Sequence, residues 1–471
     1  MRKFLTFRRV LFVILLGAFA LRVGYVAGAK KGPCDMYVGA VVVAQYHSEC
    51  MGRGPTETND QLYYNAMANE LATGKGFIDP GPVHRPVADH PPLTSVVLGV
   101  VSFAFDHEPL VHLADETKMP GGKILYTHVR EQRYFMTLVG TLNVLLIVLL
   151  ARRIGGNGVG LFAGFVAAIY PNLWINDGLL FSESIAITCV LIVLLLAWSV
   201  GKAPSLRGYA LFGCAVGAAA LARSELLLLA PLVLVPTAFS ARKDGIGRLV
   251  SRLTIAAVCA VLVLMPWFIY NQQRFTSTVL LSTNDGLVLA GSYCDSVYHG
   301  KSIGLWTTDP ACVANDSQRS KFGDQSEQSK VYRDRAWQFL KTHKKRFPLV
   351  ALARVGRAWA VLKPAEMIAY NEPENREPFV AWPGMIMYYA LLAPMVVGVV
   401  ALRRCKERRA LLILCMPMIA VTLTAIVTYG QTRLRASAEP SIVVLAALGG
   451  AWCVDGLRQR RAHTGVSVPR P

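Results

Sequence analysis

Charged residues gather at a few places along the sequence, each beside a long apolar stretch. Asp60 opens the segment DQLYYNAMANELATGKGF, and Arg85 and His90 lie in the segment HRPVADHPPL. Carboxylates exchange protons with hydroxyl groups in general acid–base catalysis, and a guanidinium group pairs with two phosphate oxygens at once. These residue types therefore indicate transfer chemistry on a hydroxyl group or a phosphate.

Two later segments carry the same residue types. Asp177 and Glu183 lie in YPNLWINDGLLFSES, and Arg433 and Arg435 lie in TRLRASAEP. Ionisable groups beside a membrane are costly and persist mainly where they are used. Structural roles are also open: Asp60 can cap the helix that follows it, the other carboxylates can cap or snorkel, and the arginines can bind lipid headgroups.

The composition identifies the environment that holds these residues. Of 471 residues, 53% are hydrophobic and only 17% are charged, and the mean hydropathy is +0.39. These values are typical of a polytopic membrane protein, so the formal net charge of +19 need not indicate nucleic acid. We expect no nucleic-acid partner, because no basic run is interleaved with aromatic residues. We find no Gly-rich phosphate loop, zinc-type spacing or repeat, which excludes the corresponding soluble classes.

Apolar runs predict the membrane spans. A helix needs about 20 residues to cross roughly 30 Å of hydrocarbon. The stretch TSVVLGVVSFAF (94–105) is too short to cross and suits an interfacial or re-entrant helix. We expect about ten transmembrane helices, near 9–27, 134–151, 158–175, 180–200, 208–222, 225–240, 253–270, 383–402, 410–428 and 439–456.

The positive charges predict how these spans are oriented. Lys and Arg in short loops favour the cytoplasmic side, and with both termini inside the basic clusters fall in the cytoplasm. Two of these clusters are RRCKERR (403–409) and LRQRRAH (457–463). Residues 28–133 and 271–382 then lie outside the cell membrane. Residues 326–364 of the second outer segment show the pattern of amphipathic, surface-lying helices.

This topology divides the chain into three parts. Residues 1–270 form a membrane domain with an N-terminal span and the first outer loop. Residues 271–382 form an extracytoplasmic segment, and residues 383–471 hold the C-terminal helices and a basic cytoplasmic tail. The N-terminal span followed by AGA is also typical of a cleaved signal peptide, and either alternative leaves residue 30 onward outside.

Four of the ten cysteines lie in the outer segments. Cys34 and Cys50 share the first, and Cys294 and Cys312 share the second. Because the exterior is oxidising, we expect two disulfides that staple these loops, with free thiols as the alternative.

The order of these segments resembles that of GT-C superfamily glycosyltransferases, of the bacterial protein-mannosyltransferase-like and aminoarabinose-transferase-like type. The matching segments are NDQLYYNAMANELATGKGF, DHPPL, YPNLWINDGLLFSES, PWFIYNQQRFTSTVLLSTNDGLVLAG and TRLRASAEP. Three residues depart from the pattern, namely Tyr270, Thr276 and Ser292. We therefore expect residues 266–292 to be structural or to shape the substrate site.

The resemblance implies an all-α GT-C fold and a sugar donor carried on polyprenyl phosphate. A sugar would pass, with inversion, to an acceptor hydroxyl on the outer face of the cell membrane, where the donor's tail lies in the bilayer. In this interpretation Asp60 is the catalytic base, Glu183 is a second carboxylate that orients a substrate, and Asp177 is an alternative second carboxylate. The donor phosphate would be bound by Arg433 and Arg435, with Arg85 or His90 assisting.

The resemblance names no sugar, and protein, lipid and glycan acceptors stay open. No cofactor and no metal ligand are expected, although the use of a divalent metal stays open. The alternatives are a transporter or flippase of a lipid-linked sugar, and a noncatalytic relative that binds such a lipid. The ionisable residues gather at the outer ends of the spans, which favours the enzyme.

Overall fold

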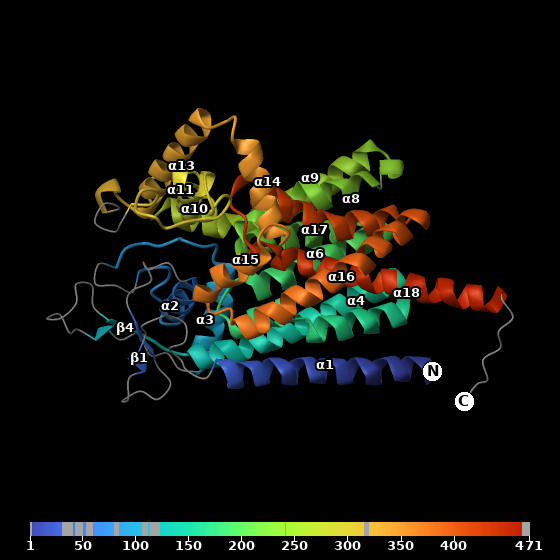
Figure 1. The fold of residues 1–471 in the computed structure, drawn as a ribbon. Helices are drawn as coiled ribbons and strands as arrows, with labels where there is room; N and C mark the ends of the chain where they lie inside the picture. Colours follow the sequence, from blue (N-terminus) through green and yellow to red (C-terminus); the bar gives the residue numbers. More distant parts are fainter. Residues whose placement is uncertain are drawn as a thin grey trace.

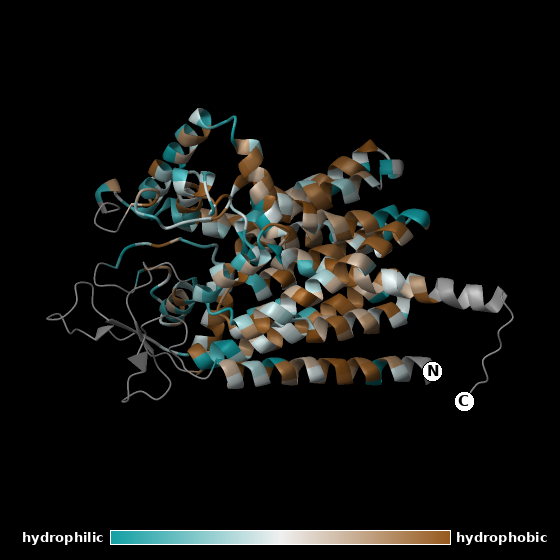
Figure 2. Ribbon diagram, in the orientation of Figure 1, coloured by the Kyte–Doolittle hydropathy of each residue, from teal (hydrophilic) through white to brown (hydrophobic). Residues whose placement is uncertain are grey.

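The long helices run side by side in a bundle (Figure 1) whose surface is largely apolar (Figure 2). The computed structural model describes residues 2–30, 41–42, 50–52, 60–79, 84–105, 112–113, 123–240, 242–314 and 320–463. The bundle helices are α1 (Arg2–Ala29), α4 (Val129–Ile169), α6 (Glu183–Lys202), α7 (Leu206–Ala222), α8 (Val235–Ser240), α9 (Ile246–Gln272), α16 (Pro378–Arg404), α17 (Arg408–Val427) and α18 (Glu439–His463).

Helix α4 contains two of the predicted spans. Its backbone leaves the helical region at Gly156, where φ is 85°, a conformation that glycine adopts without a steric penalty. Gly160 packs against Arg152, and Gly164 packs against Val148. The two halves of α4 are therefore antiparallel and form a hairpin.

The described helices confirm an all-α polytopic fold. Seven of them are long and apolar enough to cross a membrane, and α7 and the stretch Ser224–Ser240 are shorter apolar segments. The latter stretch joins the helical turns η2 (Ser224–Leu228) and η3 (Ala230–Leu234) to α8. Since α4 folds back on itself, these elements correspond to the ten predicted spans.

The ends of the bundle differ in charge. Arg152 lies over the Phe7 ring near the start of α1, and Arg404 lies over the Trp452 ring in the later part of α18. The basic pairs Arg152–Arg153 and Arg403–Arg404 are therefore both at the end where α1 starts, which we call the basic end. The opposite end, where α2 lies, is called the α2 end (Figure 1). This segregation is what the predicted topology requires. The assignment of the α2 end to the outside of the cell stays a prediction.

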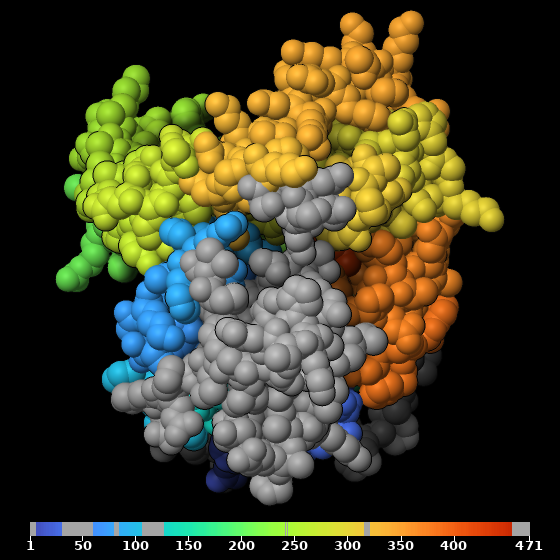
Figure 3. Space-filling view, turned by 90° about the vertical axis from the view of Figure 1, so that its left-hand side faces the viewer, coloured from blue at the N-terminus to red at the C-terminus, as the bar shows by residue number. Residues whose placement is uncertain are grey.

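The predicted outer segments form short helices at the α2 end. The first contributes α2 (Asp60–Ala72) and α3 (Leu93–Phe105), which pack on each other. The second contributes α10 (Asn284–Ser292), α11 (Asp295–Tyr298), α13 (Gln325–Thr342), α14 (Phe347–Ala358) and α15 (Pro364–Asn371). The two segments adjoin each other at the surface of this end (Figure 3), and backbone N–H of Thr283 donates to the Ala88 carbonyl at 2.8 Å.

The first segment also contains a small antiparallel sheet that the sequence did not indicate. Its strands are β1 (Val41–Val42), β2 (Cys50–Gly52), β3 (His112–Leu113) and β4 (Lys123–Tyr126), in the order β1-β2-β4-β3. Cys50 pairs with Tyr126 across the β2–β4 ladder.

A disulfide joins Cys294 to Cys312 in the second segment. The other predicted pair, Cys34 with Cys50, lies outside the side chains that the structure describes. That pairing stays a prediction.

The second segment is fixed to the bundle by a buried arginine. Arg354 of α14 donates to the Ser292 carbonyl at 2.6 Å and to the Ile426 carbonyl at 2.9 Å. Its guanidinium also lies 4.5 Å from the centre of the Tyr293 ring. Because Ile426 is near the end of α17, these contacts hold α10 and α14 against the end of α17.

The stretch that departs from the GT-C pattern packs against the first segment. The Tyr270 hydroxyl accepts a hydrogen bond from the Phe77 backbone N–H at 3.2 Å. Arg274 stacks on Tyr270 at 3.8 Å and donates to the Phe77 carbonyl at 2.6 Å. These contacts give the region a structural role.

Helix α1 is tied to the rest of the bundle by polar contacts. Arg22 pairs with Asp177 at 2.7 Å, and both side chains are almost fully buried. Tyr25 donates to Glu377 at 2.7 Å, and Lys30 pairs with the same carboxylate. These contacts join the end of α1 to the residues that precede α16, so the N-terminal span is an integrated part of the fold.

Candidate functional site

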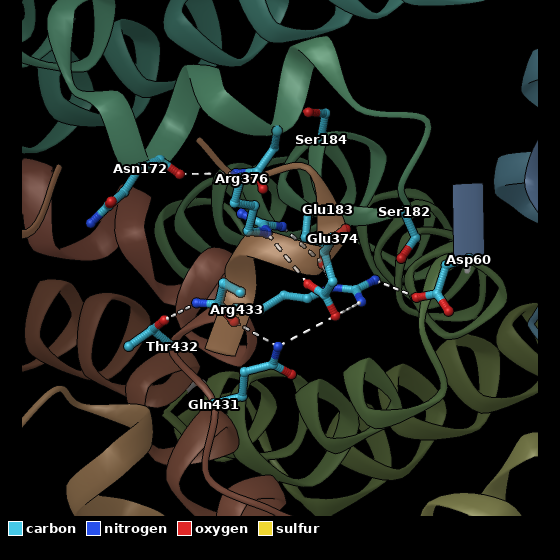
Figure 4. A network of polar contacts seen from close by, with 12 residues as sticks. Asp60, Asn172, Ser182, Glu183, Ser184, Glu374, Arg376, Gln431, Thr432 and Arg433 are labelled. Carbon is cyan, nitrogen blue, oxygen red and sulfur yellow. Dashed lines mark hydrogen bonds and ion pairs between the residues drawn. The ribbon is translucent and has the colours of Figure 1, made fainter. Parts of the chain in front are cut away.

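Arg433 lies at the centre of a group of carboxylates at the α2 end (Figure 4). Its Nη2 atom is 2.5 Å from Asp60 Oδ2, and its Nη1 atom is 3.1 Å from Glu374 Oε1. Its Nε atom donates to Glu183 Oε1. The guanidinium also lies over the Phe181 ring, 4.1 Å from the centre. One cation therefore joins three carboxylates that are far apart in the sequence.

Four elements bring these side chains together. Asp60 and Glu183 begin α2 and α6, where the helix dipole favours negative charge. Glu374 ends the helical turn η6 (Glu372–Glu374), and Arg433 lies in the helical turn η7 (Thr432–Ala438). The site is therefore assembled from helix starts and turns rather than from the middle of spans.

Hydrogen bonds between side chains hold η6 beside η7. Gln431 Nε2 donates to Asn371 Oδ1 at 2.7 Å, and Asn371 Nδ2 donates to Thr432 Oγ1 at 2.8 Å. These bonds fix the end of α15 against η7. Glu374 is thereby held within reach of Arg433.

Two further arginines surround Glu183. Arg223 Nη1 is 3.1 Å from Glu183 Oε1, and its Nε is 2.6 Å from Glu225 Oε1. Arg376 Nη2 is 3.7 Å from Glu183 Oε1, and its Nε is 3.6 Å from Glu374 Oε2. Alternating charges of this kind compensate the burial of each group. We call Asp60, Glu183, Arg223, Glu374, Arg376 and Arg433 the Arg433 cluster.

Asp60 is a member of this cluster that water reaches. Its side chain is 24% exposed, whereas that of Glu183 is fully buried. Burial raises the pKa of Asp60, but the charges of Arg433 and His90 and their hydrogen bonds outweigh it and hold the pKa well below its usual value. Asp60 is therefore an ionised carboxylate that is partly exposed to solvent.

His90 lies beside Asp60, the carboxylate that Arg433 also contacts. Its Nε2 atom is 3.3 Å from Asp60 Oδ1, and its ring packs on the rings of Tyr63 and Tyr64. Arg85, the other predicted assistant, is exposed in the preceding loop, and within the described part of the chain no ion pair of Arg85 is found.

Arg435 does not share the contacts of Arg433. Its Nε pairs with Glu439 Oε1 at 2.6 Å, and its guanidinium stacks on Tyr388 at 3.6 Å. Glu439 also accepts from the Tyr170 hydroxyl at 2.7 Å. The two arginines of the TRLR segment thus belong to neighbouring but separate groups of contacts.

Asp177 joins α1 instead of the Arg433 cluster. It lies in the helical turn η1 (Ile175–Gly178), where Arg22 and the Ser184 hydroxyl, at 2.5 Å, occupy its two oxygens. Burial raises the pKa of Asp177 to about 6, although Arg22 and Ser184 lower it in part. Glu183 is therefore the second carboxylate that the fold brings to Asp60.

Sequence reasoning missed Glu374 and Arg376. Both lie in NEPENREP, just before α16, and Arg376 is only 7% exposed. An arginine on the predicted outer side contradicts the positive-inside trend, and that signal also marked Arg433. The predicted outer segment 271–382 is long and contains many other basic residues, so this trend does not single out Arg376.

The carboxylates of the cluster do not fit a metal ion in this arrangement. Among the residues that the structure describes, no three His, Cys, Asp or Glu side chains are placed to hold one. Arg433 lies between Asp60, Glu183 and Glu374, where a cation bound by these three carboxylates would lie. We derive no step through a metal.

Comparison with known proteins shows the fold. No family model and no curated protein matches the sequence. A structure of the archaeal oligosaccharyltransferase AglB from Archaeoglobus fulgidus, in complex with an inhibitory peptide and a dolichol-phosphate, matches with a TM-score of 0.54 and 13% identity over 100% of this chain and 53% of that chain. The apo form of the Archaeoglobus fulgidus oligosaccharyltransferase matches with a TM-score of 0.51 and 14% identity, over 97% of this chain and 52% of that chain.

A third structure with some likeness is ArnT from Cupriavidus metallidurans bound to undecaprenyl phosphate. Its TM-score is 0.38 at 14% identity, over 99% of this chain and 81% of that chain. The chain spans about half the length of the archaeal oligosaccharyltransferases it matches. The chain is a polytopic membrane protein whose fold is similar to that of the archaeal oligosaccharyltransferase.

Proposed function

We propose that the protein is a glycosyltransferase that moves a sugar from a polyprenyl-phosphate donor to an acceptor hydroxyl at the outer face of the cell membrane. The observation that carries the proposal is the contact of Arg433 with Asp60, Glu183 and Glu374 at one end of the bundle. A cation beside a partly exposed carboxylate supplies the two functions that this reaction needs, a proton acceptor and a group that stabilises phosphate.

In this proposal Asp60 is the catalytic base. As the acceptor oxygen bonds to the anomeric carbon, the acceptor proton passes to the Asp60 carboxylate. The bond from the anomeric carbon to the phosphate oxygen breaks on the opposite side, and its electron pair leaves with the lipid phosphate. The configuration at the anomeric carbon is inverted, and the departing phosphate monoester carries one more negative charge than the donor did.

Arg433 stabilises that charge. Its guanidinium is held by Asp60, Glu183 and Glu374 before substrate arrives. A donor phosphate would compete with these carboxylates for the same N–H groups. A carboxylate paired so closely with a cation is a weak base, so movement of Arg433 toward the phosphate would also raise the basicity of Asp60. Donor binding would thus prepare the proton acceptor.

The other polar groups have supporting roles. Glu183, held by Arg223, fixes the position of Arg433 from its buried side. His90 orients Asp60. In this proposal that role takes the place of the contact with the donor phosphate that the resemblance implied for His90. The location at the end of the bundle lets a lipid tail lie along the apolar helices while the phosphate reaches the cluster.

The experiment that tests the proposal combines donor binding with transfer. Purified protein in detergent is mixed with a panel of polyprenyl-phosphate sugars, and thermal stabilisation identifies the donor that binds. That donor is then used in transfer assays with wild-type and Asp60→Asn protein. Equal transfer by the two proteins would contradict the mechanism. Donor binding with no transfer to any acceptor would favour the flippase or the noncatalytic lipid-binding protein.

A further inference from the structure

A group of basic and polar side chains lies at the basic end of the bundle, opposite the Arg433 cluster. It is formed where α6 ends and where α7, α9 and α17 begin. Helix α7 packs on both α6 and α9, and α17 packs on α6. The members of the group are Tyr209 of α7, Arg252 of α9, Arg409 of α17 and Asp244 of the helical turn η4 (Arg242–Asp244). We call these four residues the Tyr209 group.

Close contacts at two glycines join the ends of these helices. A Cβ atom at Gly208 would lie 2.7 Å from the Val200 side chain, so the start of α7 packs tightly on the end of α6. Gly201, in the last turn of α6, faces Arg409, and a Cβ atom there would lie 2.7 Å from Arg409 Nε. The side chain of Arg409 therefore lies directly on the backbone at the end of α6.

Arg409 has no anionic partner in this position. Its Nε atom is buried and has no hydrogen-bond acceptor, and within the described part of the chain no ion pair of Arg409 is found. The carbonyl end of α6 has a partial negative charge that attracts a cation, but no carbonyl accepts from Nε. An unpaired buried donor on a charged group is costly, and in a native fold it needs an explanation.

Tyr209 brings a second unpaired donor to the same place. Its side chain is fully buried, and its hydroxyl has no hydrogen-bond partner. The guanidinium of Arg252 lies 5.8 Å from the centre of the Tyr209 ring. The charges of Arg252, Asp244 and Arg409 all act on the hydroxyl. An unpaired hydroxyl and an unpaired guanidinium thus lie in one electrostatic environment.

The charges of the Tyr209 group do not balance. Asp244 pairs with Arg252, which leaves the charge of Arg409 without compensation inside the group. The turn RRCKERR (403–409) that precedes α17 adds further positive charge, with five basic residues and one acidic residue, Glu407. One negative charge is therefore needed to neutralise the group, and the surrounding surface attracts anions.

The location of the group indicates where that anion comes from. The helices beside it present apolar side chains to the exterior, among them Leu206 and Leu211 of α7 and Ile246 and Val250 of α9. The group thus lies where the apolar surface of the bundle meets its basic end, which is the level of lipid headgroups. Basic sites between membrane helices at such a level bind anionic headgroups.

We propose that the Tyr209 group binds the phosphodiester of an anionic phospholipid in the leaflet that meets the basic end of the bundle. A phosphodiester has one negative charge, which matches the charge that is left on the group. Arg409 is partly exposed, so the phosphate reaches its guanidinium first, and the Tyr209 hydroxyl adds a second, neutral donor. The acyl chains lie along the apolar surfaces of α7 and α9. Because the site is at the opposite end from Asp60, it is independent of the proposed sugar transfer.

The first experiment titrates the full-length protein in a neutral detergent with phosphatidylglycerol, and reads binding as thermal stabilisation at constant ionic strength. We expect Arg409→Gln to weaken binding by about tenfold or more, because it removes the charged donor. Tyr209→Phe removes one neutral donor, so we expect a smaller loss of about fivefold.

Arg404→Gln is the matched control for Arg409→Gln. It removes an exposed arginine of the same turn, whose guanidinium lies 5.6 Å from the centre of the Trp452 ring. It reduces only the general attraction of this surface for anions, so we expect a loss of less than about threefold. Equal stabilisation of wild type, Arg404→Gln and Arg409→Gln would overturn the proposed site.

A change that leaves every charge in place guards against misfolding of Arg409→Gln. In Gly201→Ala the new Cβ atom displaces the Arg409 guanidinium, which can move because it is the end of a flexible side chain. We expect this variant to fold and to lose most of its binding of phosphatidylglycerol. Gly247→Ala is its control, because Gly247 is in the first turn of α9 and a Cβ atom there meets no other atom within 4 Å. Full binding by Gly201→Ala would exclude Arg409 as the phosphate ligand.

The second experiment distinguishes an anionic lipid from other sources of phosphate. Phosphatidylethanolamine has the same phosphodiester and acyl chains but no net charge, and inorganic phosphate has the charge without the chains. We expect both to stabilise the protein clearly less than phosphatidylglycerol does. If inorganic phosphate stabilised it equally well, and through Arg409, the ligand would be a soluble phosphate and the assignment to a lipid would be wrong.

Asp60→Asn separates this site from the one at the α2 end. It changes the Arg433 cluster and leaves the Tyr209 group intact, so we expect Asp60→Asn to bind phosphatidylglycerol as tightly as wild-type protein does. A loss of binding in Asp60→Asn that equals the loss in Arg409→Gln would place the lipid at the α2 end and overturn the proposed site.

Discussion

Two buried groups of charges, the Arg433 cluster and the Arg22–Asp177 pair, differ in how many ions they contain and in their access to water. Arg22 and Asp177 form a single pair in which both side chains are at most 2% exposed. The Arg433 cluster joins six side chains, and its Asp60 is 24% exposed. Burial and pairing are therefore common to both groups, and the second differs in having a carboxylate that is partly exposed to solvent.

The surroundings shift the pKa values of Asp177 and Asp60 in opposite directions. Burial raises the pKa of Asp177 to about 6 because one arginine compensates it only in part. Burial also raises the pKa of Asp60, but Arg433 and His90 outweigh that effect and lower it. A single buried pair joins α1 to η1, whereas Arg433 and His90 together keep the partly exposed carboxylate of Asp60 ionised.

The largest expected effect concerns the accessible carboxylate. Asp60→Asn keeps the size of the side chain and removes the proton acceptor, so we expect transfer to fall by about 10²–10⁴-fold, the usual contribution of a general base. Transfer from the donor identified by binding, measured at equal concentrations of folded protein, checks this.

Asp177→Asn is the matched control for Asp60→Asn. It makes the same chemical change in the Arg22–Asp177 pair, and we expect the folded fraction of this variant to transfer sugar at close to the wild-type rate. If both variants lost activity equally, the distinction between the two groups would be wrong.

The second expected effect is on stability. Arg22→Met leaves Asp177 buried without its cation, and breaking a buried pair in this way typically costs about 3–5 kcal/mol. We expect a clearly lower midpoint of thermal unfolding, because α1 also loses its attachment to η1.

The double variant Arg22→Met/Asp177→Leu sharpens this test. Replacing both charges by apolar side chains removes the unpaired group, so we expect most of the lost stability to return. No recovery would mean that the pair contributes through something other than compensation of charge.

The sequence could predict most of the fold, because apolar runs and basic clusters report directly on spans and their ends. It also found Asp60, Glu183 and Arg433, each beside a recognisable motif. It could not separate Arg433 from Arg435, since only the fold shows that one faces Asp60 and the other faces Glu439.

Two residues of the cluster could not be predicted from the sequence, for a different physical reason. Glu374 and Arg376 lie in a polar turn without helical or strand periodicity, so nothing local distinguishes them from solvated charges. Their role comes from contacts with Glu183 and Arg433, which are far away in the chain. Contacts of this kind depend on tertiary structure alone.

Glu374→Gln tests whether the residue found only by the fold belongs to the site. The amide still accepts a hydrogen bond from Arg433, but it loses the charge that holds the guanidinium. We expect transfer to fall by about tenfold, which corresponds to about 1.4 kcal/mol, with little change in the unfolding midpoint.

Glu372→Gln is the control, because Glu372 lies in the same turn and is exposed. We expect it to leave the rate unchanged. A smaller loss in Glu374→Gln than in Glu372→Gln would remove Glu374 from the site.

The last expected effect is a dependence of stability on pH that arises from Asp177 and not from Asp60. Because the pKa of Asp177 rises from 3.8 to about 6 on folding, the folded protein binds the proton more tightly. Its contribution to stability is therefore complete below about pH 4 and is lost as the pH rises to about 6, with a slope of at most about 1.4 kcal/mol per pH unit. The pKa of Asp60 is lowered, so its contribution changes only at more acidic pH, and the two windows do not overlap. This is checked by measuring the unfolding midpoints of wild-type and Asp177→Asn protein from pH 4 to pH 7. The wild-type midpoint should fall relative to that of the variant as the pH rises to about 6. In Arg22→Met the pKa of Asp177 rises further without its cation, so the pH range over which stability changes should extend above pH 6. If neither variant changed the pH dependence of stability, the buried pair would stay ionised throughout this range.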